Sequence, residues 1–519
     1  MLLRAALLLA CSAAAAAQGC SATPDDPSLV RYGEDFLSAP LPPHATFADC
    51  VALCCQTSTC LALSFNSPQP ETTKVGGTSC LAGGVCCMLK RGVPVLGPNP
   101  NPGAVRSAAL ALGRGAAPAP PFPPSTAVTG AVVASTRTVW NGAPGAGDTW
   151  PSVWTADGRT LAWVCDTALG PMGLTELLGD PYAGNLSVTV IAGDPIDWPQ
   201  LCAPYNASAK RPDAGNIKSG GVAEVSGALF LGATCIDYGW NSTLFTRQRD
   251  IVGFVAASTD AGKTWANVTA VGAFPGRFSA PTFTNCGRGS PCRDPLMNVS
   301  WTYVFFTGSG FDDYTYWENG DAHYLARVAP DAASVANPAA YQYWVGYSGG
   351  VAPRPQWSPD ATQAQPVLAF GRMLGQNALH YNAEIGRWLV ANYGFVNAAG
   401  NPWPWHQSPW HELGVERHTQ LVMLEAPEPW GPWSVFYRDD DFGAAWNGTG
   451  GYGTTFPAAF HRPLQPDGRA DMVMLFSCGN GASGCVYKLN YVNVTLRLTQ
   501  EGIAHAAAVR HAARAAAPR

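Results

Sequence analysis

A long series of short apolar or alternating runs between Gly130 and Leu498 constrains the fold of this chain more than any other feature. Gly, Asp and Asn turn residues separate the runs, and almost none has helical periodicity. They include TLAWVCDT, GALFLGATCID, DIVGFVAASTD, YVFFTGSG, HYLARVA, RWLVANYGF, TQLVMLEA, DMVMLFSC and YKLNYVNVTLRL. Such spacing favours a sandwich, barrel or propeller. About five strand groups of roughly 65 to 75 residues each favour a propeller with few, large blades.

One octapeptide supports the propeller. Residues 258–265, STDAGKTW, match the pattern S-x-D-x-G-x-x-W, the Asp-box found on hairpins of sialidase-like propellers. The aspartate closes the turn, the glycine permits the required backbone, and the tryptophan packs beneath it. We therefore interpret Asp260 as a structural residue and not as a catalytic one.

The N-terminus and the composition indicate an extracellular protein. MLLRAALLLACSAAAAAQG has one basic residue, a short apolar run and a small-residue cleavage site, which predicts a signal peptide over residues 1–17. No later run reaches the roughly 18 apolar residues of a membrane-spanning helix. Charged residues make up only 13% of the chain and the net charge is −5, so nucleic acid is not an expected partner. We expect a secreted glycoprotein with N-glycosylation sequons at Asn185, Asn206, Asn241, Asn267, Asn298, Asn447 and Asn493.

Eight of the sixteen cysteines lie between Cys20 and Cys87. Behind a signal peptide this density predicts a small disulfide-stapled module over residues 18–92. A zinc site is the alternative, but no histidine is interleaved at ligand spacing. Pro-rich residues 93–128 predict an extended linker, residues 129–498 the propeller, and residues 499–519 an Ala-rich tail, either a loose helix or disordered.

The N-terminal module resembles the PAN/apple family. The resemblance rests on TFADCVALCCQTSTCLALSFN and the later CCMLK, and covers about 75 residues. It implies a small helix-on-sheet domain that binds a protein or glycan ligand. The surplus cysteines depart from the family pattern, so no disulfide pairing is carried over.

Acids and aromatic residues are the remaining candidates for chemistry, because no G-x-S-x-G, H-E-x-x-H, P-loop or dinucleotide motif occurs in the required context. The loop WPWHQSPWHE contains more aromatic residues than a sheet core can bury, and exposed tryptophans form platforms for sugar rings. A glycan cleft is therefore predicted, with substrate-binding candidates Trp405, His406, Trp410, His411 and Glu412.

The central domain resembles the secreted five-bladed propeller family catalogued as domain of unknown function 4185. The resemblance rests on GDTWP, the D-G-R-x-L hairpin with V-x-D, KSGGV, YLARV, EAPEPWGPW, YGTTFP and a final N-V-T-L strand, and it spans nearly all of residues 130–498. That family includes endo-D-arabinanases. The resemblance implies a glycoside hydrolase whose first blade directs acids into the central channel.

The resemblance places Asp148 of GDTWP and Asp166 of WVCD at the catalytic positions. Glycosidases use two carboxyl groups, ~5 Å apart for retention and ~6.5 to 9.5 Å apart for inversion. Without the resemblance, both residues could equally be turn or strand-end residues. Glu318 is a reserve acid, and Trp150, Lys218 and Asp321 are further substrate-binding candidates, although Lys218 could simply be solvated.

Seven cysteines in the propeller region leave at least one unpaired. Cys286 with Cys292 and Cys478 with Cys485 are spaced as local disulfide staples. Cys165 precedes Asp166 on a presumed inner strand, where we expect a buried thiol rather than a nucleophile.

The sequence therefore predicts a secreted glycoside hydrolase that acts on a furanose-containing, arabinan-like polysaccharide. The alternative is a non-catalytic carbohydrate-binding or adhesion glycoprotein, because a propeller fold does not by itself transfer activity. A sialidase is a weaker alternative, since only one clear Asp-box is present. No cofactor is expected, and no motif requires calcium.

Overall fold

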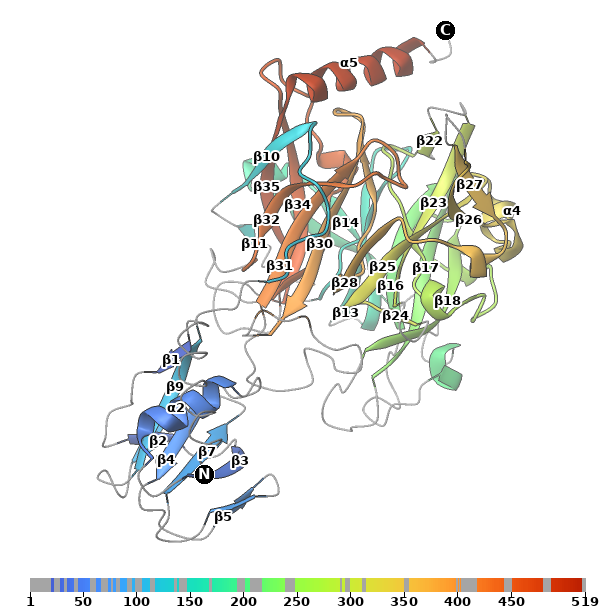
Figure 1. Cartoon of the computed structure of the whole chain (residues 1–519). Coiled ribbons are helices and arrows are strands. Elements are labelled where there is room, and N and C mark those ends of the chain that lie inside the picture. Colours follow the sequence, from blue (N-terminus) through green and yellow to red (C-terminus); the bar gives the residue numbers. More distant parts are fainter. Residues whose placement is uncertain are drawn as a thin grey trace. The chain divides into compact units, whose positions relative to one another are not determined.

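The structure is a computed structural model in which the chain forms two compact units, the smaller comprising mainly the first 118 residues and the larger nearly all of the rest (Figure 1). It describes residues 20–22, 29–31, 35–41, 45–56, 62–66, 73–75, 78–80, 85–90, 96–98, 105–112, 117–134, 138–139, 147–167, 170–193, 201–205, 217–238, 248–289, 292–294, 299–309, 314–349, 354–397, 400, 402, 418–442, 450–478 and 487–515. None of the helices in these segments is long and apolar enough to cross a membrane.

The smaller unit is an α+β module built on a five-stranded antiparallel sheet in the order β1-β9-β4-β7-β3. One helix, α2 (Phe47–Gln56), contributes Cys50 to the core of the module, and a disulfide joins Cys50 to Cys87 of β7. The strands are β1 (Cys20–Ala22), β2 (Leu29–Arg31), β3 (Asp35–Leu41), β4 (Ala62–Asn66), β5 (Thr73–Val75), β6 (Thr78–Cys80), β7 (Val85–Lys90), β8 (Leu96–Pro98) and β9 (Val105–Leu112).

Part of the range expected to be a linker belongs to this module. Strand β9 pairs with both β1 and β4, and β8 pairs with β2. The prolines of the range lie mostly on either side of β9, whose sequence VRSAALAL contains none, so its backbone can donate to both neighbours. An extended linker over the whole of 93–128 is therefore not what forms.

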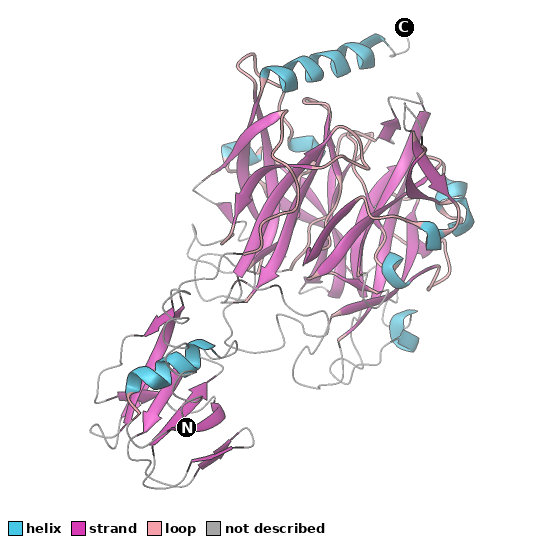
Figure 2. Ribbon diagram, viewed as in Figure 1, coloured by secondary structure: helices cyan, strands magenta, loops and turns pink. Residues whose placement is uncertain are grey.

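The larger unit is a five-bladed β-propeller. Figure 2 shows that strands make up most of this unit. By their pairing they form five successive antiparallel sheets, each a meander of neighbouring strands. The last sheet is closed by β10 (Val128–Val133), which comes from the start of the unit and pairs with β35 (Asn490–Leu498). Pairing the first strand with the last joins the two ends of the unit and leaves no gap between the first and last blades.

The blades follow chain order. Blade 1 contains β12 (Ser152–Trp154), β13 (Thr160–Thr167), β14 (Gly170–Leu178) and β15 (Ser187–Gly193); blade 2 contains β16 (Ile217–Val225), β17 (Ala228–Asp237), β18 (Arg249–Ser258), β19 (Ala266–Asn267), β20 (Phe274–Pro275) and β24 (Thr315–Tyr316). Blade 3 contains β21 (Thr282–Phe283), β22 (Cys292–Asp294), β23 (Val299–Gly308), β25 (Gly320–Val328), β26 (Gln342–Tyr347), β27 (Pro355–Ser358) and β28 (Leu368–Leu374). Blade 4 contains β29 (His380–Asn382), β30 (Arg387–Val396), β31 (His418–Ala426) and β32 (Ser434–Asp439); blade 5 contains β33 (Gly451–Thr455), β34 (Arg469–Cys478), β35, β10 and β11 (Thr138–Val139).

Apart from the C-terminal helix, the helices described in this unit are only three or four residues long. The described helices are η1 (Pro181–Ala183), η2 (Ala203–Tyr205), η3 (Gly276–Phe278), α4 (Ala332–Val335), η4 (Pro338–Ala340), η5 (Ala361–Gln363), η7 (Ala458–Phe460) and the C-terminal α5 (Gln500–Ala515). The range expected to be an Ala-rich tail is thus mostly helix α5, which packs on the propeller: Arg510 Nη1 donates to the Glu384 carbonyl at 2.8 Å.

The Asp-box forms the turn between β18 and β19. Asp260 Oδ1 accepts from the backbone N–H groups of Lys263 and Thr264, at 3.1 and 2.9 Å. Gly262 has φ +90°, and the indole of Trp265 donates to its carbonyl at 2.9 Å. These contacts close a hairpin turn and leave Asp260 outside any site.

Candidate active site

Asp148 and Asp166 come together because their backbones pair. The N–H of Asp148 donates to the Cys165 carbonyl at 2.9 Å, and the N–H of Cys165 donates to the Asp148 carbonyl at 2.8 Å. Asp166 follows directly after this pair, near the end of β13. The two acids therefore lie at the same end of blade 1, one on each of two paired segments.

The backbone departs from ordinary strand geometry at this point. Asp166 has φ +53° and Thr149 has φ +46°. Side chains alternate between faces in a regular strand, so Asp166 would point away from the face that Asp148 shares with Cys165. The left-handed backbone of Asp166 breaks this alternation. Such strain is found mostly where the surrounding structure enforces it, often at functional sites.

Lys218 of β16, in blade 2, completes an ion pair with Asp166. Its Nζ lies 2.5 Å from Asp166 Oδ2, and the two side chains are 12% and 26% exposed, respectively. Burial by itself would lower the pKa of Lys218, but the carboxylates of Asp166 and Asp148 outweigh it and raise that pKa well above its usual value. The lysine therefore stays charged and favours the ionised form of Asp166.

The environment of Asp148 favours its neutral form. The residue is only 6% exposed, and burial raises its pKa to about 6. Lys218 opposes this shift, whereas the nearby Asp166 carboxylate adds to it. The Tyr452 and Tyr487 hydroxyls also lower this pKa, but less than burial raises it. One acid of the pair is thus held ionised and the other is held closer to neutral.

Two tyrosines of blade 5 fix the carboxyl groups. The Tyr452 hydroxyl donates to Asp148 Oδ2 at 2.9 Å, and the Tyr487 hydroxyl donates to Asp166 Oδ2 at 3.2 Å. Tyr487 also lies close enough to Asp148 to lower the pKa of that carboxyl. Burial, followed by the nearby carboxylates, raises the pKa of both phenols, so both remain hydrogen-bond donors.

Glu318 approaches the same region from blade 3. It lies between β24 and β25, is fully buried, and its Oε1 accepts from Gln248 Nε2 at 2.8 Å. The Trp317 indole donates to Gln248 Oε1 at 2.9 Å and packs on Tyr452 with ring centroids 5.5 Å apart. In blade 4, Tyr393 has a pKa that is raised by burial, by Glu318 and by Asp148. Side chains from all five blades therefore converge around these acids.

Sequence reasoning missed Asp250 of β18. It is completely buried, neither carboxyl oxygen has a hydrogen bond of good geometry because the nearby Thr234 hydroxyl donates to the Val252 carbonyl, and burial raises its pKa to about 8. Thr234 and Lys218 lower that pKa, and Asp250 in turn contributes to the raised pKa of Tyr393. The apolar run DIVGFVAAS made this residue look like a strand start, and the run gave no sign that its carboxyl would be enclosed.

Two residues predicted to bind substrate, Trp150 and Asp321, make structural contacts instead. Trp150 as a sugar platform is wrong: it is 1% exposed, its indole donates to Ser477 Oγ at 3.0 Å, and it packs in the core between blades 1 and 5. Asp321 accepts from the Arg372 backbone N–H at 2.9 Å and from Ser309 Oγ at 3.3 Å. Asp321 therefore holds β28 and the end of β23 against β25.

The aromatic loop lies outside the described residues, and so do Trp405, His406, Trp410, His411 and Glu412. Of the sequons, Asn185 and Asn267 are exposed and Asn493 is half-buried in β35, whereas Asn206, Asn241, Asn298 and Asn447 are outside the described segments. Their modification remains a prediction.

The cysteines of the larger unit divide between disulfides and one thiol. Cys286 and Cys292 form a disulfide, and so do Cys202 and Cys235, a pair that the sequence did not reveal. Cys478 is disulfide-bonded, and Cys485 is not among the described residues. Cys165 is a free, buried thiol whose Sγ lies 3.2 Å from Ser219 Oγ. Burial raises the pKa of this thiol, which makes it a poor nucleophile.

Within the described segments, no three His, Cys, Asp or Glu side chains gather as a set of metal ligands. Burial lowers the pKa of His323 and of His380 to about 3 and that of His461 to about 4, and His461 adds to the lowering at His380. The chemistry that these described residues offer is that of carboxyl groups and phenols.

No protein-family profile matches the chain, and no curated protein matches its sequence. Solved structures are similar at low identity. A putative hydrolase from Bacteroides ovatus has a TM-score of 0.38 and 12% identity, over 69% of this chain and 87% of its own. An α-L-arabinofuranosidase from Podospora anserina, solved with cellotriose, has a TM-score of 0.34 and 10% identity, over 70% of this chain and 98% of its own. A glycoside hydrolase family 43 β-xylosidase/α-arabinofuranosidase from a compost metagenome, solved with xylotriose, has a TM-score of 0.34 and 12% identity, over 70% of this chain and 95% of its own. The roles of this chain's residues therefore have to follow from their own geometry.

Proposed function

We propose that this protein is a secreted glycoside hydrolase that acts on a furanose-containing, arabinan-like polysaccharide. The observation that carries the proposal is the carboxyl pair Asp148 and Asp166, whose surroundings favour opposite protonation states. Two neighbouring acids in such different surroundings are the arrangement that glycoside hydrolysis needs, because one must donate a proton and the other must act as a carboxylate.

Asp148 is assigned as the general acid. Its pKa of about 6 leaves about half of the carboxyl neutral at pH 6 and about a tenth at pH 7. The proton moves from this carboxyl group to the leaving glycosidic oxygen as the bond to the anomeric carbon breaks. Asp166 is the carboxylate that either attacks the anomeric carbon or takes a proton from the attacking water. Lys218 is a positioning residue that keeps Asp166 ionised, and the Tyr452 and Tyr487 hydroxyls fix the orientation of the two carboxyl groups.

The furanose substrate class rests on the sequence resemblance. GDTWP, KSGGV and YGTTFP supply Asp148, Lys218 and Tyr452, and these three segments come from different blades. Three motif segments of the resemblance thus contribute to one set of interacting side chains. This convergence is what a shared active site would require of them, and it supports extending the arabinanase-like activity to this chain.

Product release from a panel of arabinans, galactans and plant or algal wall polysaccharides tests the proposal. We expect the parent protein to release products from at least one arabinan. Asp148→Asn and Asp166→Asn should each reduce the rate of release by a factor of roughly 10² to 10⁴. Asp360→Asn is the matched control, because Asp360 caps a short helix in an exposed turn. Activity that survives in both site variants would contradict the carboxyl-pair assignment.

A non-catalytic carbohydrate-binding protein is the second candidate, and one observation favours it. Asp148, Glu318 and Asp250 are all nearly or completely buried, and the nearby rings of Trp317 and Tyr393 both pack against Tyr452. A glycosidase acid must reach its substrate, whereas a binding protein has no such requirement. Retained polysaccharide binding with no product from any member of the panel would establish this second candidate.

A further inference from the structure

A pocket lies at the end of blade 1 opposite to the acids. It has a volume of about 540 Å³, within the usual range for small-ligand sites, and blade 5 forms its other wall. Thr160 lines it at the start of β13, whereas Asp166 lies six residues further along the same strand. At about 3.3 Å per residue the two places are roughly 20 Å apart, so the pocket is separate from the acid pair.

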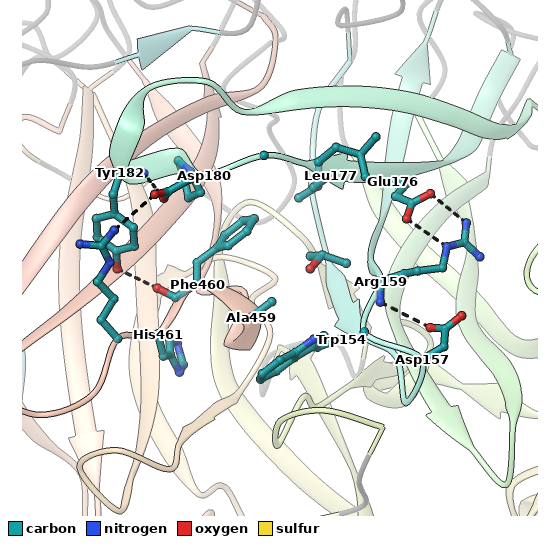
Figure 3. A pocket seen from close by; sticks show the side chains of 16 residues that line it. Trp154, Asp157, Arg159, Glu176, Leu177, Asp180, Tyr182, Ala459, Phe460 and His461 are labelled. Carbon is teal, nitrogen blue, oxygen red and sulfur yellow. Dashed lines mark hydrogen bonds and ion pairs between the residues drawn. The ribbon is translucent and has the colours of Figure 1, made fainter.

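The pocket combines aromatic and planar polar side chains. Figure 3 shows Glu176, Arg159 and Asp157 on one side and Tyr182, Asp180 and Phe460 on the other, with Trp154 at the edge between them. Trp154 is only half-buried. Leu178, which is 43% exposed, also lines the pocket and is one of four large apolar side chains that the described residues leave exposed.

Both arginines that line the pocket are already paired with carboxylates. Arg159 makes two hydrogen bonds of 3.0 Å to Glu176, and Arg462 lies 3.4 Å from Asp180 and covers the Tyr182 ring at 3.7 Å. His461 is neutral at neutral pH, because burial lowers its pKa to about 4. Neither arginine among the lining residues is left unpaired to attract a phosphate or carboxylate. The fixed donors and acceptors can instead hydrogen-bond to the hydroxyl groups of a sugar. The half-buried indole of Trp154 beside them can stack on the apolar face of the sugar ring.

We infer that this pocket is a second carbohydrate-binding site, for a neutral oligosaccharide segment, with Trp154 as its stacking platform. The site would hold a polysaccharide chain or the protein's own N-glycan at a distance from the acids. The protein's own N-glycan is a candidate occupant because the sequon residue Asn185 lies beside the pocket, where its Oδ1 accepts from the backbone N–H of Asp180 at 2.7 Å. Both sources present the same sugar-ring chemistry. The inference does not depend on hydrolysis at Asp148.

Calorimetric titration of the full-length Asp166→Asn protein with a linear arabino-oligosaccharide and with cellohexaose tests the inference, and polygalacturonate serves as the anionic comparison. We expect saturable binding of a neutral probe that Trp154→Ala weakens at least tenfold. Leu178→Ser keeps the fold intact, because its side chain is exposed, and should weaken the same binding two- to fivefold. Val299→Ser is the matched control, with an equally exposed apolar side chain on blade 3, and should leave binding unchanged.

The titrations are run before and after enzymatic removal of N-glycans. Trp154-dependent binding in both preparations indicates an external polysaccharide, and binding that emerges only after removal indicates that the Asn185 glycan fills the pocket. If neither preparation binds a neutral probe in a Trp154-dependent and Leu178-dependent way, or if polygalacturonate binds more tightly there, the inference is wrong. None of these outcomes depends on product release, so failure of this site is distinguishable from failure of the proposed hydrolase activity.

Discussion

Replacing Asp250 with Asn should stabilise the propeller, and increasingly so as the pH rises. Asp250 is completely buried with no hydrogen bond of good geometry, and burial raises its pKa from 3.8 to about 8 even though Thr234 and Lys218 oppose the shift. A carboxyl whose folded-state pKa exceeds its unfolded-state value contributes stability that is complete below the unfolded pKa and is lost as the pH rises through the folded pKa. At 1.36 kcal/mol per pKa unit, the loss reaches about 4 kcal/mol at pH 7 and about 5 kcal/mol at pH 8.

Thermal unfolding of the parent and Asp250→Asn proteins from pH 4 to pH 8 measures this loss. With about 2.1 cal/mol/K of unfolding entropy per residue over the larger unit, 5 kcal/mol corresponds to a Tm difference of about 6 °C at pH 8, shrinking toward zero near pH 4. Asp360→Asn is the control and should show no such gain, because its neighbouring Thr362 groups lower the pKa of Asp360. A Tm difference that stays constant over this pH range would refute the assignment of an enclosed, unpartnered carboxyl.

Three further predictions concern residues around the acids. Lys218→Met should lower kcat, because the ionised state of Asp166 loses its ion pair. It should also move the alkaline limb of the kcat/KM profile to higher pH, because Lys218 lowers the pKa of Asp148. An unshifted limb would contradict the assignment of Asp148 as the general acid. Trp150→Ala should reduce the free energy of unfolding by about 3 to 5 kcal/mol, as a buried tryptophan does, and a change in substrate affinity without this loss would restore it as a platform. Tyr452→Phe should raise the pKa of Asp148 by removing its hydrogen bond at Oδ2, which a pH profile of kcat/KM measures as a shift of the limb that Asp148 sets.

The larger fold was accessible from the sequence because its strands are short, regularly spaced and separated by turn residues. The Asp-box at residues 258–265 could be interpreted as a structural turn because its physics is local. The exact extent of the N-terminal module could not be predicted, because β9 lies among prolines and its two strand partners come from distant parts of the sequence.

The acid pair was only partly accessible. Asp148 and Asp166 were identified by resemblance, but their opposite environments depend on Lys218, Tyr452 and Tyr487, which come from other blades. Asp250 carried no local signal, since only tertiary packing encloses it. Trp150 was misassigned for the same reason: a tryptophan beside an acid looks like a substrate platform until the neighbouring blade is known to cover it.

The rate of hydrolysis of an aryl arabinofuranoside with a highly activated leaving group is the measurement that tests the assigned roles most directly. A leaving group such as 2,4-dinitrophenolate departs without protonation, so a variant that lacks only the general acid should be largely spared. We predict that Asp148→Asn retains most of the parent rate on this substrate while losing activity on arabinan, and that Asp166→Asn loses activity on both. The opposite pattern, with Asp166→Asn spared and Asp148→Asn inactive on both, would contradict the division of roles between the two carboxyl groups.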